Sequence, residues 1–131
     1  MYKQDYLLKV IEDFFLVLKL IIKIDVFEEN SNFEKEMNEL FLKTFCINLK
    51  EIDKIDLEKY SEIIHNEENR NYMIVALLKL AKYYQLKDSD LSNSYIELSK
   101  YLFNQISKTI NFSSNYLETE IKELFTNLKQ N

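Results

Sequence analysis

Glu62 and His65 come closest to a catalytic or metal-binding pair in this sequence. Their E-x-x-H spacing places both side chains on one face of a helix, which is the half-motif of carboxylate-bridged di-iron bundles. Such a site needs two of these pairs and two further carboxylates, whereas the chain contains one histidine. Only a symmetric dimer could supply the second pair, with Glu36 or Glu58 as further ligands. We therefore expect no metal site, and we interpret His65 as a surface residue near a helix C-terminus, where a cation complements the helix dipole.

Two other patterns are too incomplete to predict chemistry. The segment 88–90 (DSD) resembles the start of a calcium loop, but Asn93 and Ser99 stand where a glycine and a bidentate glutamate belong, so a helix cap is the expected role. Cys46 is the only cysteine, and one cysteine with one histidine cannot form a tetrahedral zinc site. Because Cys46 lies between two hydrophobic residues, we expect a buried, reduced thiol in a cytoplasmic protein. No catalytic residue and no cofactor are predicted.

The composition excludes several further kinds of site. The 131 residues include no glycine and no proline. Phosphate-cradling glycine loops, dinucleotide-binding fingerprints and the G-x-S-x-G nucleophile elbow all need glycine at fixed places, so none of them can be present. The 17 basic and 22 acidic residues give a net charge of −5, which disfavours a nucleic-acid partner.

The same composition predicts a single all-α domain over residues 1–131, because nothing in the chain interrupts helices. Clusters of Asn, Asp and Ser replace glycine and proline between the helical segments. We expect five to six helices in antiparallel hairpins, as a helical bundle or a tetratricopeptide-like arrangement. The expected helices cover residues 3–28, 33–46, 56–66, 70–87, 91–110 and 114–129. The segment 72–86 is the most apolar, so it should lie centrally, with Leu80 on its buried side.

The first expected helix carries an unusual pair of leucines. Its apolar run over residues 14–24 includes Lys19 and Lys23 and is too short to cross a bilayer, so no transmembrane segment is predicted. Leu16 and Leu20 fall within the charged stripe of this helix at i, i+4 spacing. Apolar residues ringed by charges are typical of a contact surface, so we expect these leucines to touch another chain, most simply a second copy. The alternative is that the domain itself buries this helix on all sides.

Tyrosines are the remaining feature of the sequence. The chain has nine tyrosines, nine phenylalanines and no tryptophan. Tyr83, Tyr84, Tyr95 and Tyr101 fall on two adjacent expected helices. Core packing explains most such residues, but a tyrosine can bury its ring and keep its hydroxyl in water, so these four are also candidates for a peptide-binding surface.

Two stretches resemble known families. The opening residues 1–12 (MYKQDYLLKVIE) are similar to the start of a family of small bacterial proteins of unknown function, which begin with a Q-D-Y-[IL]-[ML] helix. Leu77, Leu80, Ala81 and Tyr84 resemble the first-helix pattern of a tetratricopeptide repeat, although the second helix matches it poorly. A second similarity to the bacterial family lies in Asn71-Tyr72 and in residues 111–113 (NFS). The resemblance implies a helical-repeat-like scaffold and brings no catalytic residue with it.

The function expected from these observations is a non-catalytic helical scaffold that binds a protein partner or forms a homodimer. Two alternatives belong to other classes. One is a small-molecule-binding or metal-binding helical bundle, for example a hydrolase. The other is a peripheral membrane protein that attaches through its first helix.

Overall fold

The computed structural model describes residues 2–24, 32–60, 63, 65–106, 122, 123, 125 and 126. These residues form the α-helices α1 (Tyr2–Ile21), α2 (Phe33–Phe45), α4 (Glu67–Tyr84) and α5 (Ser89–Ile106), and the short 3-10 helices η1 (Leu49–Lys54) and η2 (Leu57–Lys59). Within these ranges there is no strand, which confirms the all-α class. The expected count of five to six helices is wrong for this part of the chain, which has four α-helices. The helix expected over 114–129 falls mostly outside the described residues.

The η1–η2 segment (residues 49–59) differs most from expectation. The sequence predicts a break between two helices near residues 48–56 and an α-helix from residue 56. Leu49 and Ile52 are buried, and their spacing of three matches the three residues per turn of a 3-10 helix. Ile55 then adopts an extended conformation, with φ −68° and ψ 134°, which separates η1 from η2. The segment therefore crosses the bundle as two short 3-10 helices that bury one side chain per turn, namely Leu49, Ile52 and Leu57.

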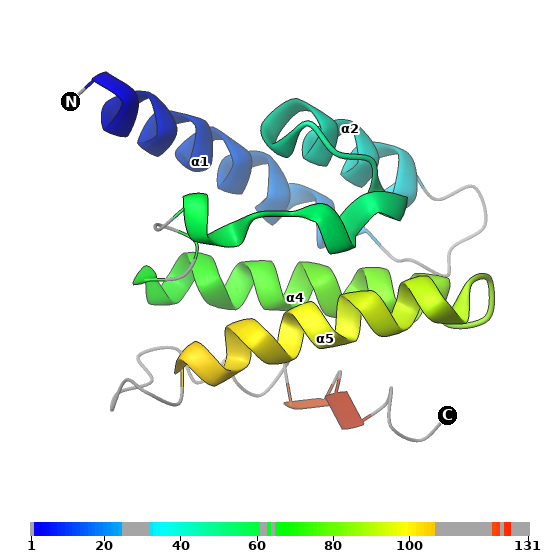
Figure 1. The fold of residues 1–131 in the computed structure, drawn as a ribbon. Helices are drawn as coiled ribbons and strands as arrows, with labels where there is room; N and C mark the ends of the chain where they lie inside the picture. Colours follow the sequence, from blue (N-terminus) through cyan, green and yellow to red (C-terminus); the bar gives the residue numbers. More distant parts are fainter. Residues whose placement is uncertain are drawn as a thin grey trace.

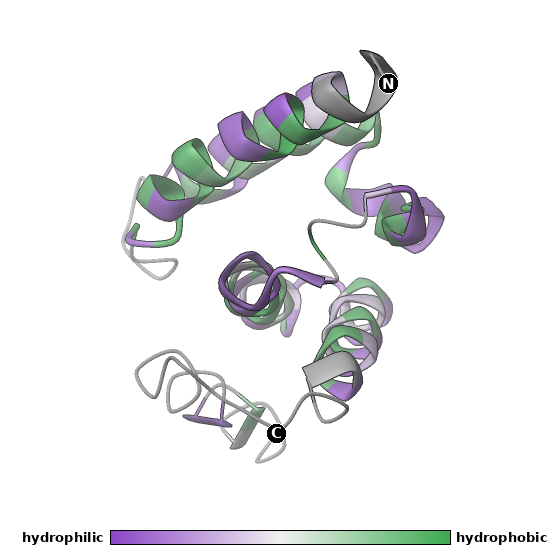
Figure 2. Cartoon of the chain, turned by 90° about the vertical axis from the view of Figure 1, so that its left-hand side faces the viewer, coloured by the Kyte–Doolittle hydropathy of each residue, from purple (hydrophilic) through white to green (hydrophobic). Residues whose placement is uncertain are grey.

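Helix α4 lies at the centre of the fold. Of its 18 residues, 11 are buried, and no side chain from Met73 to Leu78 is accessible to solvent. Helices α1 and α2 run antiparallel above α4, and α5 returns antiparallel along its lower side (Figure 1). Viewed end-on, the η1–η2 segment closes the side between α2 and α5 (Figure 2). The central position expected for this helix and the burial of Leu80 are both confirmed.

Aromatic side chains fix the orientation of α1. Phe14 makes edge-to-face contacts with Phe41 and Phe45 of α2, at ring-centroid distances of 5.7 and 5.0 Å. Phe45 in turn meets the ring of Tyr60 at 5.0 Å. Because Phe14 and Leu18 are fully buried, the opposite side of α1 must face away from the domain.

Side chains of Asn and Asp begin the two helices of the central hairpin. The Asn66 side chain accepts a hydrogen bond of 3.0 Å from the Asn69 backbone N–H at the start of α4. The Asp88 carboxylate accepts one of 3.1 Å from the Leu91 backbone N–H at the start of α5. These bonds satisfy backbone donors that the first turn of a helix leaves unpaired. The interpretation of Asp88 as a helix cap is therefore confirmed.

Cys46 ends α2 in a conformation that usually requires glycine. Its backbone is left-handed, with φ 60° and ψ 31°, and its N–H bonds the Leu42 carbonyl at 3.1 Å. The expected burial of the thiol is wrong, because Cys46 is exposed. The chain turns at this residue, and the inward positions are taken by its neighbours, buried Phe45 and half-buried Ile47.

We predict that Cys46→Gly stabilises the protein by about 1 kcal/mol, because glycine has no β-carbon to crowd the left-handed backbone. Urea unfolding followed by circular dichroism measures the change. Cys46→Ala is the control, since it removes the thiol but keeps the β-carbon. Equal stabilisation by both substitutions would show that the thiol, and not the backbone, is responsible.

Candidate functional site

The outward face of α1 carries exposed leucines. Leu16 and Leu20 are 65% and 66% exposed, and Val17 beside them is also exposed. At 100° per residue, these leucines lie on the opposite side of the helix from buried Phe14 and Leu18. We call Leu16 and Leu20 the leucine ridge. The alternative expectation, that the domain buries α1 on all sides, is therefore wrong for this face.

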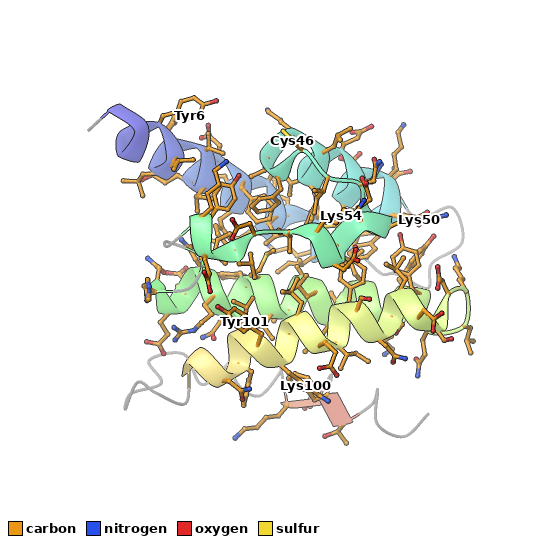
Figure 3. All side chains as sticks on the ribbon, in the orientation of Figure 1. Tyr6, Cys46, Lys50, Lys54, Lys100 and Tyr101 are labelled. Carbon is orange, nitrogen blue, oxygen red and sulfur yellow. The ribbon has the colours of Figure 1, made fainter. Side chains whose placement is uncertain are left out.

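Charged residues surround the leucine ridge on the same face. Lys9 and Asp13 form an ion pair of 3.2 Å, and Glu12 and Lys23 are exposed. Tyr6, further toward the N-terminus, is also exposed and points away from the rest of the molecule (Figure 3). The ridge is thus a small apolar strip inside a charged rim of both signs, which is the usual composition of a contact surface.

Lys19 plays a different role from the other lysines of α1. Its ammonium lies 3.4 Å from the Glu68 carboxylate and 5.0 Å from the centre of the Tyr72 ring, both on α4. It therefore connects α1 to the central helix. The first turn of α4 is thereby fixed against α1.

The four candidate tyrosines do not form one surface. Tyr84 and Tyr95 are buried, and their rings stack with centroids 5.9 Å apart. The Tyr84 hydroxyl donates a hydrogen bond of 2.6 Å to the Glu34 carboxylate, and the Tyr95 hydroxyl donates one of 2.7 Å to the Leu49 carbonyl. Both rings are core residues, because helices α4 and α5 meet there, so their assignment to a binding surface is corrected.

The other two tyrosines keep some contact with solvent. Tyr83 is half-buried, and its hydroxyl donates a hydrogen bond of 3.2 Å to the same Glu34 carboxylate. The Lys87 ammonium lies 3.9 Å from the centre of the Tyr83 ring. Tyr101 is 37% exposed and lies on α5 (Figure 3). Of the four candidates, only Tyr101 is exposed.

Burial raises the pKa of both Tyr84 and Tyr95 above the ordinary value for tyrosine. For Tyr84 the hydrogen bond to Glu34 acts in the same direction, since that bond needs the neutral phenol as donor. For Tyr95 the negative charge of Glu34 adds to the effect of burial. Both hydroxyls therefore stay protonated in the folded protein when an unfolded tyrosine, with a pKa near 10, would ionise.

We predict that the free energy of unfolding falls as the pH rises above about 10. A raised pKa in the folded state means that the unfolded chain binds fewer protons at alkaline pH, so stability is complete below this range and decreases above it. Each buried tyrosine contributes up to about 1.4 kcal/mol per pH unit to this loss. Urea unfolding between pH 8 and 11 measures the slope.

Tyr95→Phe should reduce that alkaline slope by removing one of the two ionising groups. Tyr101→Phe is the matched control, because Tyr101 is exposed. A change of slope that is the same in both variants would contradict the assignment to the buried hydroxyls.

A groove lies between the η1–η2 segment and α5. It has a volume of about 430 Å³ at one end and continues into a hollow of about 280 Å³. Ile55, Leu98 and Tyr101 line both parts. We call it the Tyr101 groove. One signal in the sequence could have revealed it, namely the apolar residues spaced by three at Leu49, Ile52 and Ile55.

A second cleft, of about 450 Å³, lies between α2 and η1 and has a polar lining. Glu34, Asn38 and Asn48 contribute to it, with Glu51 and Tyr84. The Asn38 side chain accepts a 3.0 Å hydrogen bond from the Leu49 N–H, and Glu51 accepts 3.2 Å bonds from the Asn48 backbone and side chain. The pKa of Glu51 is lowered, first by the hydrogen bond from the Asn48 backbone N–H and next by the hydrogen bond and positive charge of Lys54. The hydrogen bonds of Asn38, Asn48 and Glu51 hold η1 in place, so these side chains have a structural role in the cleft.

The described residues hold no cluster suited to metal binding. His65 is exposed, while Glu62 of the E-x-x-H pair lies outside them. Among the residues that are described, no group of three His, Cys, Asp or Glu side chains is placed to hold a metal ion. In the same part of the chain, no helix is both long enough and apolar enough to span a membrane.

No protein-family model, curated protein or solved structure matches this chain. The resemblances of the opening residues and of the α4–α5 hairpin to known families stay predictions. The candidate surfaces, the leucine ridge and the Tyr101 groove, therefore rest on their geometry alone.

Proposed function

We propose that this protein is a non-catalytic helical module that self-associates through the leucine ridge of α1. The observation that supports this proposal is the position of Leu16 and Leu20, which are two-thirds exposed at the centre of a helix face that points away from the domain. Full burial of a leucine is worth about 1.5–3 kcal/mol, so covering both side chains supplies a driving force for association.

The charges around the ridge favour a second copy as the partner. Two α1 helices can cross antiparallel about a twofold axis that passes the outer face of α1 at the level of Leu18 along the helix. Leu16 then lies opposite Leu20 of the other copy, because each is two residues from Leu18. Asp13 lies opposite Lys23 in the same register, since each is five residues from Leu18. The twofold axis repeats both contacts, so one arrangement buries four leucines and brings opposite charges together twice.

The helical phase of these residues agrees with that register. At 100° per residue, Leu16 and Leu20 lie about 20° to either side of one line along α1, and Asp13 lies about 40° from it on the side of Leu20. Lys23 lies in the tighter turn that follows α1, where its N–H bonds the carbonyl of Leu20, three residues earlier, at 3.3 Å, and this turn keeps it on the same side of the helix as Leu20. A symmetric pair therefore places leucines in the middle and charges outside, as in protein interfaces generally.

The oligomeric state tests the proposal. We predict that the wild type forms a concentration-dependent dimer and that Leu16→Glu/Leu20→Glu is monomeric, because four carboxylates would meet at the axis. Sedimentation equilibrium over a range of concentrations measures the mass, and circular dichroism checks the fold. Leu86→Glu is a matched control, since Leu86 is an exposed leucine outside α1 and its substitution should leave the dimer unchanged.

A charge exchange separates pairing from general apolar association. Asp13→Lys should weaken the dimer several-fold, and adding Lys23→Asp should restore it, because the exchange keeps opposite charges facing each other. A wild type that stays monomeric at millimolar concentration overturns the proposal. If that monomer floats with anionic liposomes and the double leucine variant does not, the membrane-attachment alternative takes its place.

A further inference from the structure

The Tyr101 groove combines an apolar lining with an acidic rim. Its apolar part consists of Ile52, Ile55 and Leu57 on the η1–η2 side and Leu98 and Tyr101 on the α5 side. Ile55 and Leu98 are half-buried, so their side chains are partly open to a ligand. Tyrosine is a frequent anchor in interfaces, and the Tyr101 hydroxyl makes no hydrogen bond to the described residues.

Three carboxylates of the rim have no cationic partner among the described residues. Asp53, Asp56 and Glu58 are exposed, and none of them forms an ion pair in the part of the chain that the structure describes. Two nearby carboxylates differ in this respect, because Glu51 pairs with Lys54 at 3.4 Å and Glu97 with Lys100 at 3.7 Å. The residues that line the η1–η2 side of the groove therefore include three carboxylates and no lysine or arginine, next to apolar surface.

We propose that the Tyr101 groove binds a short cationic peptide that places apolar side chains between the η1–η2 segment and α5 and sets Lys or Arg against Asp53, Asp56 and Glu58. The length of the groove limits the ligand. Along α5 it runs from Asn93 to Tyr101, about 12 Å at 1.5 Å per residue, which equals roughly two helical turns or four extended residues. This surface is separate from the leucine ridge, and the proposal does not depend on self-association.

Binding of a model peptide tests the proposal. The probe is the capped peptide KLLKKLLK, labelled for fluorescence anisotropy, and ELLEELLE is its charge-reversed counterpart. We expect the cationic peptide to bind at low salt and the acidic peptide not to bind. Backbone amide NMR shifts caused by the cationic peptide should be confined to residues 52–58 and 93–101.

Removal of the rim charges provides the decisive comparison. Asp53→Asn/Asp56→Asn/Glu58→Gln keeps the side-chain shapes and should weaken binding about tenfold, with a smaller dependence on salt. Glu39→Gln/Asp90→Asn/Glu123→Gln makes the same change in net charge at exposed carboxylates outside the groove, and it should leave the affinity within about twofold. Tyr101→Ala should also weaken binding by removing the anchor, with circular dichroism as the check on folding.

Several results would overturn the proposal. These are no binding of KLLKKLLK at millimolar concentration, equal loss in the two charge-neutralised variants, and NMR shifts spread over the surface or confined to α1. Shifts in the groove that grow with protein concentration alone would show that a second copy occupies it. A monomeric wild type would refute the self-association proposed above and leave this test unaffected.

Discussion

The burial of α4 is the constraint on which the rest of the structure depends. A helix with no exposed side chain from Met73 to Leu78 must be covered around its whole circumference. Helices α1 and α5 cover two sides, and the η1–η2 segment closes another, held by the hydrogen bond from Tyr95 to the Leu49 carbonyl. Since α1 uses Phe14 and Leu18 for this purpose, its leucine ridge is left on the outside.

The absence of glycine shapes the ends of these elements. Asn66 and Asp88 begin α4 and α5 with side-chain hydrogen bonds, so polar caps replace flexible residues there. At the end of α2 a left-handed residue is still required, and Cys46 adopts that conformation at a cost in backbone strain. The thiol is exposed because the chain turns at Cys46.

The helix class, the central position of α4 and the cap at Asp88 could be predicted from composition and periodicity, because each depends on local sequence. The η1–η2 segment was harder to predict, because the spacing of three between Leu49 and Ile52 is a short signal and the burial of both residues depends on helices distant in the sequence. The tyrosines show the same limit. Tyr84 and Tyr101 both lie on expected helices, but only the contact between helices decides that one stacks on Tyr95 and the other lines a groove.

The two proposed surfaces lie on different elements, with α4 between α1 and α5. Pairing through α1 would therefore leave the Tyr101 groove of each copy open. A dimer would then present two acidic grooves in a fixed twofold relation. A partner with two cationic segments would bind the second groove at a high effective concentration, so weak peptide binding and weak self-association would reinforce each other. By linkage, such a partner would also stabilise the dimer, because it binds the paired form more tightly than two separate copies.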